Sequence, residues 1–471
     1  MPETKKKPQK PSDASKQVKE PVVNQPILSE EQTLYEQEKL AEAEKVNFIA
    51  SLNIEPPPIH IDYINTGGSR DKRYSFDVDA RVCVIGTKLG QPSIYRTQDR
   101  LEHVGSPIKL NIINLLQKDS SQIDNKDINL IAETIKKSKT NKIIISGGLD
   151  HAIRIMKELY EKLKGIDKTI IYGGSNSSFY SNRKAIFVDT GVELAAVQLY
   201  PKGSFMIATN LAVFDIKNIE RNLFPAIEHK DVMRSIFSKT NSLTDATGKL
   251  LNIPKFTAVD FGGTFGKILE YSANNINQDY VYPNIGSLDS LFNDVLVKFG
   301  ASVGMADKVI IGERIDSMLS DDVYRQRILA ILRAIETKHQ IITHGTDSMA
   351  NTMYEVFQRG NMGKNYIFTG SCTPLSEEET TDGFHSVGAA FAIVSYLEAI
   401  EKGDIKKRPE SNVWLAIGGL VLPYNENIIK DNEGRFIHTT CEQHHKYLEL
   451  NMKHLTLYQK GYKLKNKKNM W

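Results

Sequence analysis

Two turns in this sequence carry hydroxyl groups where strands are expected to end. Gly262-Gly263-Thr264 follows the apolar run 256–261, and Gly345-Thr346-Asp347 follows the apolar run 341–343. In open α/β sheets, ligands bind beyond the carboxyl ends of the strands. A hydroxyl beside a carboxylate at such a place suggests chemistry more than packing. These two turns are therefore the first candidates for an active site.

Each of these side chains also has a purely structural explanation. Threonine and aspartate are good helix N-caps, so Thr264 and Asp347 could simply begin the helices that follow them. For an isolated Gly-Gly-Thr, the cap is the better explanation. An active site is favoured because several strand ends of one predicted sheet carry suitable groups.

The segment from Gly262 to Lys267 also resembles a phosphate-binding loop. It has one residue too few between the first glycine and the Gly-Lys pair, and Ile268 stands where a serine or threonine would bind magnesium. We therefore set a nucleotide site aside.

Four residues of metal-binding type lie near the C-terminus in one short segment. Because no second cysteine pair closes a tetrahedral site, chance clustering is favoured over a metal centre. We expect neither a metal nor a cofactor. The four residues are His438, Cys441, His444 and His445.

Alternating strands and helices are expected to position the two turns. This alternation predicts an α/β fold of two tandem Rossmann- or flavodoxin-like three-layer units with mainly parallel sheets, behind a disordered basic tail. The strands are expected at 81–85, 142–146, 169–172 and 205–208 in the first unit, and at 257–261, 309–312, 340–343, 366–369 and 413–417 in the second.

The strand-end signatures recur in one order, which favours an internal duplication over two unrelated Rossmann-like domains. Gly86-Thr87 corresponds to Gly263-Thr264, Gly148-Leu149-Asp150 to Gly345-Thr346-Asp347, and Gly173-Gly174-Ser175 to Thr369-Gly370-Ser371. The expected domains are a disordered tail, short helix and linker over 1–79, a first unit over 80–235, a second unit over 250–445, and a basic C-terminal tail over 446–471.

The helix in the N-terminal segment is expected over about residues 30–50. Ser29 and Gln32 have the spacing of a capping box at its start. This helix is either a partner-binding element or a helix docked on the body.

Composition limits the function classes. The chain has 471 residues, of which 25% are charged and 40% apolar, as in soluble globular proteins. A net charge of +3 is too small to indicate nucleic-acid binding, and the lysine-rich ends are expected to be solvated. No membrane-spanning run or secretory signal is evident. Three cysteines indicate a reducing compartment, so a cytoplasmic protein without nucleic-acid or membrane partners is expected.

The second unit resembles the catalytic N-terminal domain of the bacterial-type L-asparaginases. The resemblance is carried by Gly262-Gly263-Thr264 and Thr343-His344-Gly345-Thr346-Asp347, supported by Asp316-Ser317 and Asp382-Gly383. It implies an amidohydrolase that releases ammonia from a small amino-acid amide, asparagine or glutamine, without a cofactor. It leaves open a homo-oligomer.

The resemblance also implies roles for individual residues. Thr264 would be the nucleophile, which needs activation because a threonine hydroxyl is weak at its own pKa. Thr346, Asp347 and Lys430 would form a proton-handling triad. Tyr280, on the loop after the first motif, would position the nucleophile, with Tyr282 the next choice. Asp316, Ser317, Gly345 and Gly263 would bind the substrate.

The first unit resembles the same domain without its chemistry. Thr87 and Asp150 would keep the places of the nucleophile and the carboxylate. Leu149 replaces the triad threonine and cannot relay a proton. Arg221 would stand for the lysine and cannot act as a base. We expect a pseudo-site that serves structure or substrate closure.

The resemblance implies a smaller C-terminal domain after the catalytic one, and we expect this domain to be absent because only 41 residues follow Lys430. The first unit could take over part of its role. Two other interpretations remain open: an inactive ligand- or protein-binding scaffold, and a glutaminase-type amidase subunit of a transamidation complex.

Overall fold

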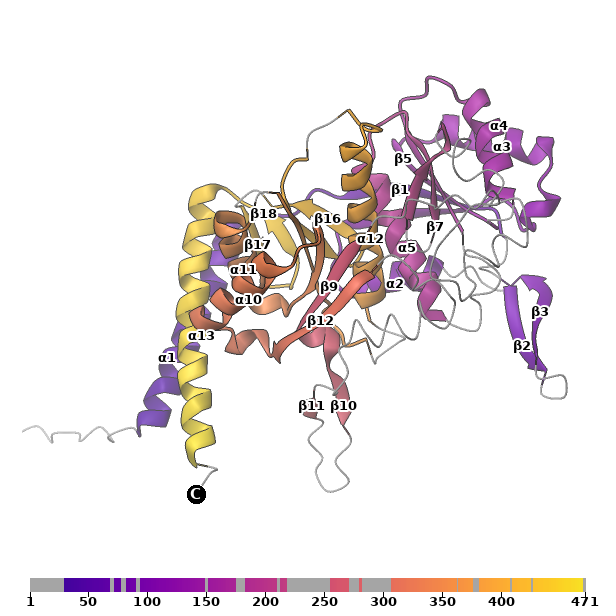
Figure 1. The fold of residues 1–471 in the computed structure, drawn as a ribbon. Coiled ribbons are helices and arrows are strands. Elements are labelled where there is room, and N and C mark those ends of the chain that lie inside the picture. Colours follow the sequence, from indigo (N-terminus) through magenta and orange to yellow (C-terminus); the bar gives the residue numbers. More distant parts are fainter. Residues whose placement is uncertain are drawn as a thin grey trace, which may run out of the picture.

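The computed structural model describes most of the chain and shows two α/β units. The described residues are 29–67, 72–77, 82–89, 94–148, 151–174, 183–209, 212–217, 255–270, 279–281, 306–361, 363–375, 381–406, 409–424 and 427–468. The first unit is coloured purple and magenta in Figure 1, and the second is orange and yellow.

Each unit is built on a six-stranded sheet, and the two sheets have the same topology. Their orders are β4-β1-β5-β6-β7-β8 and β12-β9-β13-β14-β15-β16. In each, five strands are parallel and the last is an antiparallel return. The predicted α/β class with two mainly parallel sheets is confirmed.

The strands of the first sheet are β1 (Ile59–Asn65), β4 (Ile108–Asn114), β5 (Lys142–Ser146), β6 (Thr169–Gly173), β7 (Phe205–Thr209) and β8 (Ala212–Asp215). Of these, β5, β6 and β7 are almost continuous apolar runs, as expected for strands covered on both faces, whereas polar residues interrupt β1 and β4.

The strands of the second sheet are β9 (Phe256–Gly262), β12 (Ala306–Ile315), β13 (His339–Thr343), β14 (Asn365–Thr369), β15 (Val413–Ile417) and β16 (Leu420–Pro423). The central strands β9, β13 and β14 are fully buried. A separate hairpin of β17 (Ile428–Lys430) and β18 (Phe436–His438) follows.

Helices connect the strands within each unit. In the first unit they are α2 (Ile94–His103), the 3-10 turn η2 (Ser120–Gln122), α3 (Asn125–Lys137), α4 (Ala152–Lys162) and α5 (Arg183–Leu199). In the second they are η5 (Thr264–Gly266), η7 (Ser317–Leu319), α10 (Asp322–Ala334), α11 (Thr346–Arg359) and α12 (Gly383–Glu401).

The two units pack on each other through α5 and α12, which lie between the sheets (Figure 1). One apolar core contains residues of both helices and both sheets, so the units share an interior. A β-carbon on Gly388 would lie 2.0 Å from the Val188 carbonyl oxygen, and one on Gly191 would lie 2.3 Å from that of His385. The two backbones approach closely because glycine stands at both positions.

The first unit begins earlier than predicted. Residues 59–65, expected as linker, form β1 in the centre of the first sheet. The strand expected at 81–85 instead belongs to β3 (Val82–Leu89), which pairs only with β2 (Lys72–Asp77) in a separate antiparallel ribbon. The proposed start at residue 80 and the equivalence of Gly86-Thr87 with Gly263-Thr264 are therefore wrong.

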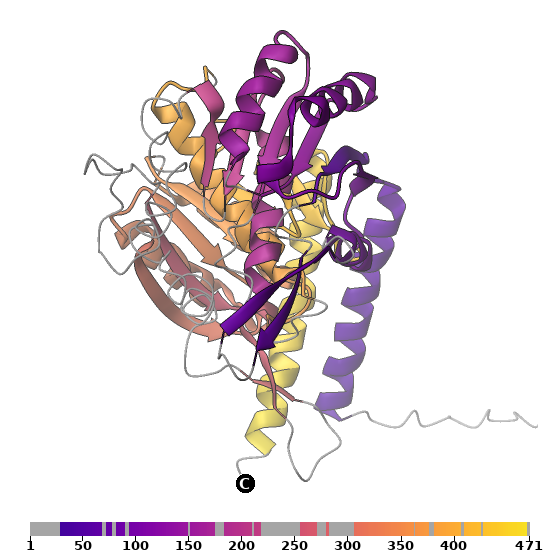
Figure 2. The ribbon, with the colours of Figure 1, turned by 90° about the vertical axis from the view of Figure 1, so that its right-hand side faces the viewer.

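Both terminal helices dock on the second unit. The N-terminal helix α1 (Glu30–Leu52) begins at Ser29 with the predicted capping box. The segment 446–471, predicted as a solvated tail, belongs mostly to the helix α13 (Cys441–Lys468), which buries Leu455 and His454. The two helices run side by side in both views (Figures 1 and 2). The tail prediction is wrong because only one face of this helix is basic and solvated.

Among the described residues, one helix is long and apolar enough to cross a membrane. This helix is α12, and 83% of its most apolar stretch is buried inside the protein. Its apolar residues form the contact between the two units.

Candidate active site

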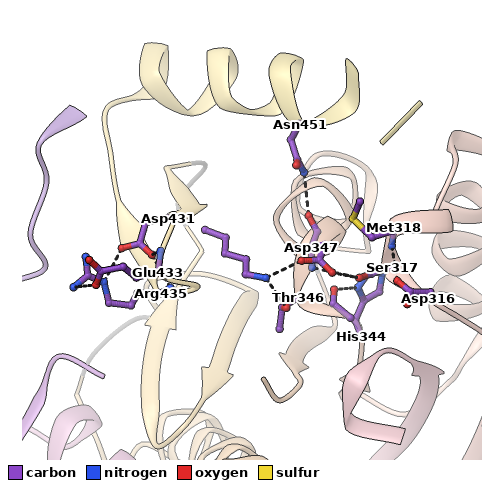
Figure 3. Close-up of polar contacts among 12 residues, drawn as sticks. Asp316, Ser317, Met318, His344, Thr346, Asp347, Asp431, Glu433, Arg435 and Asn451 are labelled. Carbon is purple, nitrogen blue, oxygen red and sulfur yellow. Dashed lines mark hydrogen bonds and ion pairs between the residues drawn. The ribbon is translucent and has the colours of Figure 1, made fainter. Parts of the chain in front are cut away.

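Three of the predicted catalytic residues meet at the N-terminus of α11. Lys430 Nζ donates to Thr346 Oγ1 at 2.8 Å and to Asp347 Oδ1 at 2.8 Å. Thr346 and Asp347 are the first residues of α11, and Lys430 ends β17 (Figure 3). Lys430 is 84 positions from Thr346 and 83 from Asp347 in the sequence, and the fold brings these three residues into one cluster.

Ser317 completes the surroundings of the Asp347 carboxylate. Its hydroxyl donates to Asp347 Oδ2 at 3.1 Å and accepts from the Asp347 backbone N–H at 3.3 Å (Figure 3). Burial disfavours the charged carboxylate, but the Lys430 ammonium and the Ser317 hydroxyl outweigh it, so the pKa of Asp347 lies below its usual range. The helix N-terminus also favours an anion here. Asp347 is therefore ionised at neutral pH.

Glycines let three strand-end loops meet at this point. Gly263 has φ +80°, and a β-carbon there would lie 2.3 Å from the Gly345 nitrogen. A β-carbon on Gly345 would lie 2.4 Å from Ser317 Oγ. Any side chain at either glycine would push the loops apart, so Gly263 and Gly345 act by allowing this approach.

A buried carboxylate fixes the loop that carries Thr264. Asp260 Oδ1 accepts from Thr343 Oγ1 at 2.6 Å and from the Gly262 backbone N–H at 2.9 Å. Asp260 is fully buried. It therefore links β9 to β13 and holds the turn that begins at Gly262.

Thr264 itself stands one residue beyond the contact between Gly263 and Gly345. It begins η5 and is partly exposed. Among the described residues, no side chain hydrogen-bonds to its hydroxyl, so the observed contacts bring its loop, but not its oxygen, to the Lys430 cluster. Its role as nucleophile stays a prediction.

Asp316 is held by its neighbours. Lys267 Nζ donates to Asp316 Oδ2 at 2.6 Å, and Oδ1 accepts from the Met318 backbone N–H at 3.0 Å. This ion pair connects the segment after η5 to η7, which carries Ser317. The geometry gives Asp316 a supporting position beside Ser317 (Figure 3).

Tyr280 lies in β11 (Asp279–Val281), opposite Leu269 of β10 (Ile268–Glu270). This hairpin projects from the body in Figures 1 and 2. The side chain of Tyr280 lies outside the described part of the chain, as does Tyr282, so the role of Tyr280 remains a prediction.

His344 is a further member of the site that sequence reasoning did not single out. Its Nδ1 lies 2.8 Å from the Gly345 carbonyl oxygen, and its Nε2 lies 3.0 Å from Thr352 Oγ1. Because a carbonyl can only accept, Nδ1 must carry the proton. Burial lowers the pKa of His344 to about 4, so the ring is neutral at pH 7 and fixes the peptide between Gly345 and Thr346. The sequence feature that could have identified it is its position directly after the strand β13.

The first unit repeats part of this local structure. Asn65 ends β1 as Asp260 lies near the end of β9, and its Oδ1 accepts from the Gly67 backbone N–H at 3.1 Å. The sequence after β1 reads Thr-Gly-Gly-Ser, so Ser69, and not Thr87, follows the paired glycines. Leu149, Asp150 and Arg221, predicted as the degenerate triad, lie outside the described residues, as does Ser69.

In the histidine-rich segment near the C-terminus, His444 has a structural role. His444 is fully buried, and its Nε2 lies 3.1 Å from the Tyr424 hydroxyl. The one group of described residues that could hold a metal lies elsewhere and comprises His339, Glu398 and Glu401. Lysines pair with both glutamates, Lys402 with Glu398 and Lys338 with Glu401, so the cluster is an internally neutralised ion-pair network.

Comparisons with known proteins bear on the second unit. The sequence model of the asparaginase N-terminal family matches residues 255–404, which include Thr264, Ser317, Thr346 and Asp347. The second unit is an asparaginase-family domain. The match ends before Lys430, so the place of this lysine rests on its contacts alone. The search of curated proteins finds no match.

Solved L-asparaginases are also similar to the chain. The thermostable enzyme from Thermococcus kodakarensis is 11% identical, covers 73% of this chain and 95% of its own, and gives a TM-score of 0.25. A probable cytoplasmic L-asparaginase from Campylobacter jejuni is 13% identical with a TM-score of 0.26, over 73% and 95%. L-asparaginase I from Vibrio cholerae is 12% identical with a TM-score of 0.27, over 74% and 98%.

Proposed function

We propose that this chain is an L-asparaginase-type amidohydrolase that releases ammonia from asparagine, with glutamine as the second substrate. The observation that supports it is the convergence of Lys430 Nζ on Thr346 Oγ1 and Asp347 Oδ1 within an asparaginase-family domain. A lysine, a hydroxyl and a carboxylate in contact can move a proton, which a packing role does not require.

The proposed reaction has two steps. Thr264 Oγ1 attacks the side-chain amide carbon, and its proton passes through the Thr346 and Lys430 groups to the leaving nitrogen, which departs as ammonia. Water then attacks the resulting ester, and the acid and Thr264 are released. The acyl-enzyme splits one difficult displacement into two easier ones.

Two features would stabilise the charge that develops during the attack. His344 fixes the peptide whose N–H belongs to Thr346, at the N-terminus of α11. A fixed backbone N–H at a helix N-terminus is a suitable donor for an oxyanion. Ser317 and Asp347, hydrogen-bonded to each other, would hold the α-carboxylate and the α-amine of the substrate.

The proposal includes a cytoplasmic setting and a small-molecule substrate. The sparse cysteines support a reducing compartment. We also propose that the two units arose by duplication, because their strand orders are identical, and that the first unit has no hydrolytic role. Whether two copies of the chain assemble is open to a direct measurement of mass in solution.

A binding scaffold without hydrolysis is the second candidate function. It is favoured by one observation: within the described part of the chain, no hydrogen bond joins the Thr264 hydroxyl to the Lys430 cluster. Under this alternative, the site binds an amino acid through Ser317 and Asp347 but does not cleave it.

Ammonia release from asparagine and from glutamine, by wild type and by Thr264→Ala, separates the two candidates. Loss of a nucleophile should lower kcat at least about 10⁴-fold. Thr134→Ala is a matched control, because that threonine lies on α3 and its hydroxyl bonds only within the helix. An inactive wild type that still binds aspartate would support the scaffold, whereas equal rates for wild type and Thr264→Ala would remove Thr264 from the mechanism.

A further inference from the structure

A chain of hydrogen bonds connects the N-terminal helix to the start of α11. Lys45 Nζ of α1 donates to Asn451 Oδ1 of α13 at 3.4 Å and lies 3.2 Å from His454 Nδ1. Asn451 Nδ2 in turn donates to the Asp347 carbonyl oxygen at 3.0 Å and to Asn351 Oδ1 at 2.7 Å (Figure 3).

The orientation of the Asn451 amide follows from its partners. A lysine ammonium can only donate and a backbone carbonyl can only accept, so the amide oxygen must face Lys45 and its nitrogen must face Asp347. Both amide protons and the oxygen are then engaged. Asn451 is 1% exposed. A fully bonded and buried amide holds the first turn of α11 in one position.

The two terminal helices reach the other parts of the site as well. Gln459 Nε2 of α13 donates to the Met318 carbonyl oxygen at 3.2 Å, in the turn that begins with Ser317. A small apolar cluster joins Ile49 of α1 and Tyr447 of α13 to Ile429, which precedes Lys430. The helix pair therefore contacts all three segments that supply Lys430, Asp347 and Ser317.

We propose that Lys45 and Asn451 are positioning residues of this active site: Asn451 orients the turn that carries Thr346 and Asp347, and Lys45 holds the Asn451 amide in that orientation and adds its positive charge to that of Lys430. This inference rests on the proposed function and adds to it the two terminal helices. None of the sequence motifs pointed to either residue.

The charges around Asp347 support the electrostatic part. The Lys45 ammonium lowers the pKa of Asp347, although less than burial raises it and less than Lys430 lowers it. Burial also lowers the pKa of Lys45 itself, and Asp347 and Glu42 oppose that change. The two lysines therefore act together on one carboxylate.

Five other titratable groups interact electrostatically with Asp347, and these five carry no charge at neutral pH. Burial lowers the pKa of His344 to about 4 and also lowers that of His454, so both rings are neutral. Burial raises the pKa of the remaining acids, which stay protonated. They are Cys372, Tyr447 and Tyr458. Lys45 and Lys430 are then the cations that set the ionisation of Asp347.

The first test measures the pKa of Asp347 by an NMR titration of protein labelled with ¹³C at the aspartate carboxyl groups. Asp347→Asn identifies the signal. We expect Lys45→Met to raise this pKa and Lys45→Arg, which keeps the charge, to leave it near the wild-type value. Lys453→Met is the matched control, because Lys453 lies on α13 and pairs at 2.6 Å with Glu44, the neighbour of Lys45. It should leave the pKa unchanged.

The second test is the pH profile of kcat/KM. Because Lys45→Met raises the Asp347 pKa, the acid limb should move to higher pH. On that limb kcat/KM should fall, while at neutral pH it should stay near the wild-type value and far from the roughly 100-fold loss that a misplacement of about 1 Å can cause. Asn451→Asp, which loses both N–H donors at constant size, should lower kcat/KM at all pH values.

Two results would overturn this inference. One is a Lys45→Met protein with the wild-type Asp347 pKa and pH profile, and the other is an equal change in Lys453→Met. The NMR titration needs no turnover. If the wild type releases no ammonia, the proposed hydrolysis fails, yet the effect of Lys45 on Asp347 is still decided.

Discussion

At the scale of single residues, the cluster of Lys430, Thr346 and Asp347 is the centre of the site. Lys430 makes its two contacts from a side chain that is 19% exposed. The ion pair with Asp347 is therefore partly desolvated, so it constrains geometry more strongly than a surface pair. Thr346 lies against the same ammonium, and in the proposed mechanism this contact places the threonine hydroxyl on the proton path.

Substitution of Lys430 tests the catalytic role of its ammonium group. Lys430→Met removes the ammonium but keeps the length of the side chain, and kcat for ammonia release should fall at least about 100-fold because general acid-base catalysis contributes that much. Lys430→Arg keeps the charge but cannot exchange a proton near neutral pH, so it should not restore the rate. Lys430→Arg with wild-type kcat would show that only the charge matters.

The site could be predicted from sequence in part, and the reason lies in the kind of residue involved. Thr346 and Asp347 follow a short apolar strand and a glycine, a local pattern that can be read directly. Asn451 and Lys45 carry no local pattern, since an asparagine and a lysine on polar helices are ordinary surface residues. Their place depends on how α1 and α13 dock, which is a tertiary property.

At the scale of elements, the sequence indicated the strands of the second unit well and the first strand of the first unit poorly. β13 and β14 are apolar runs closed by glycine-containing turns. β1 alternates isoleucine with polar residues, and its Asp62 is buried because Asn111 Nδ2 of the neighbouring strand donates to it at 2.9 Å. The amide that stabilises this buried carboxylate is far away in the sequence. The sequence around Asp62 therefore resembles a polar linker more than a buried strand.

The helix α13 was missed for a related reason. Its six lysines from residue 453 onwards suggest a solvated tail. The buried residues Tyr447, Asn451, His454 and Leu455 recur at helical spacing on the opposite face. Because two of these four are polar, the amphipathic pattern is weak in the sequence.

The element-scale prediction concerns the contact of α5 with α12. Gly388→Ala would place a β-carbon against the Val188 carbonyl oxygen, which is backbone and cannot rotate away. We expect a loss of about 1–3 kcal/mol in the free energy of unfolding, the usual cost of overpacking. Denaturant unfolding measures it.

Gly461→Ala is the matched control for this prediction. Gly461 lies inside α13, and its nearest neighbour would be the Glu38 carboxylate at 3.8 Å from the new β-carbon. Alanine is the better helix former by about 1 kcal/mol, so this variant should be slightly more stable than wild type. Equal stability of wild type and Gly388→Ala would mean that the two helices do not approach as closely as described.

At the scale of the whole molecule, two sheets of one topology share a core through α5 and α12, and two terminal helices cover the site of the second. Because the two units share one apolar core, a destabilising substitution at the contact of α5 and α12 should also disturb the site of the second unit. Buried histidines are spread through this interior. His344 is in the site, His385 at the contact between the units, and His444 on the buried face of α13.

Because these histidines are buried, we expect the free energy of unfolding to depend on pH. Burial lowers the pKa of His344 and His444 to about 4 and that of His385 to about 3. The unfolded chain takes up protons near the ordinary histidine pKa of about 6.5, whereas the folded chain does not. Stability should therefore be complete above about pH 6.5 and fall as the pH decreases towards 4.

The midpoint of urea unfolding, measured from pH 8 to pH 4, checks this expectation. His385→Gln removes one titrating group, so its curve should be flatter than that of wild type over the same interval. A wild-type midpoint that stays constant between pH 6.5 and pH 4 would contradict the burial of neutral imidazoles.

The proposed hydrolysis requires that Thr264 forms an ester with the substrate beside the Lys430 cluster. Peptide mass spectrometry of the protein mixed with asparagine and quenched in acid detects this ester directly. We expect an aspartyl adduct on the peptide that contains Thr264, absent from Thr264→Ala. Ammonia release with the adduct on another peptide, or undiminished ammonia release by Thr264→Ala, would contradict it.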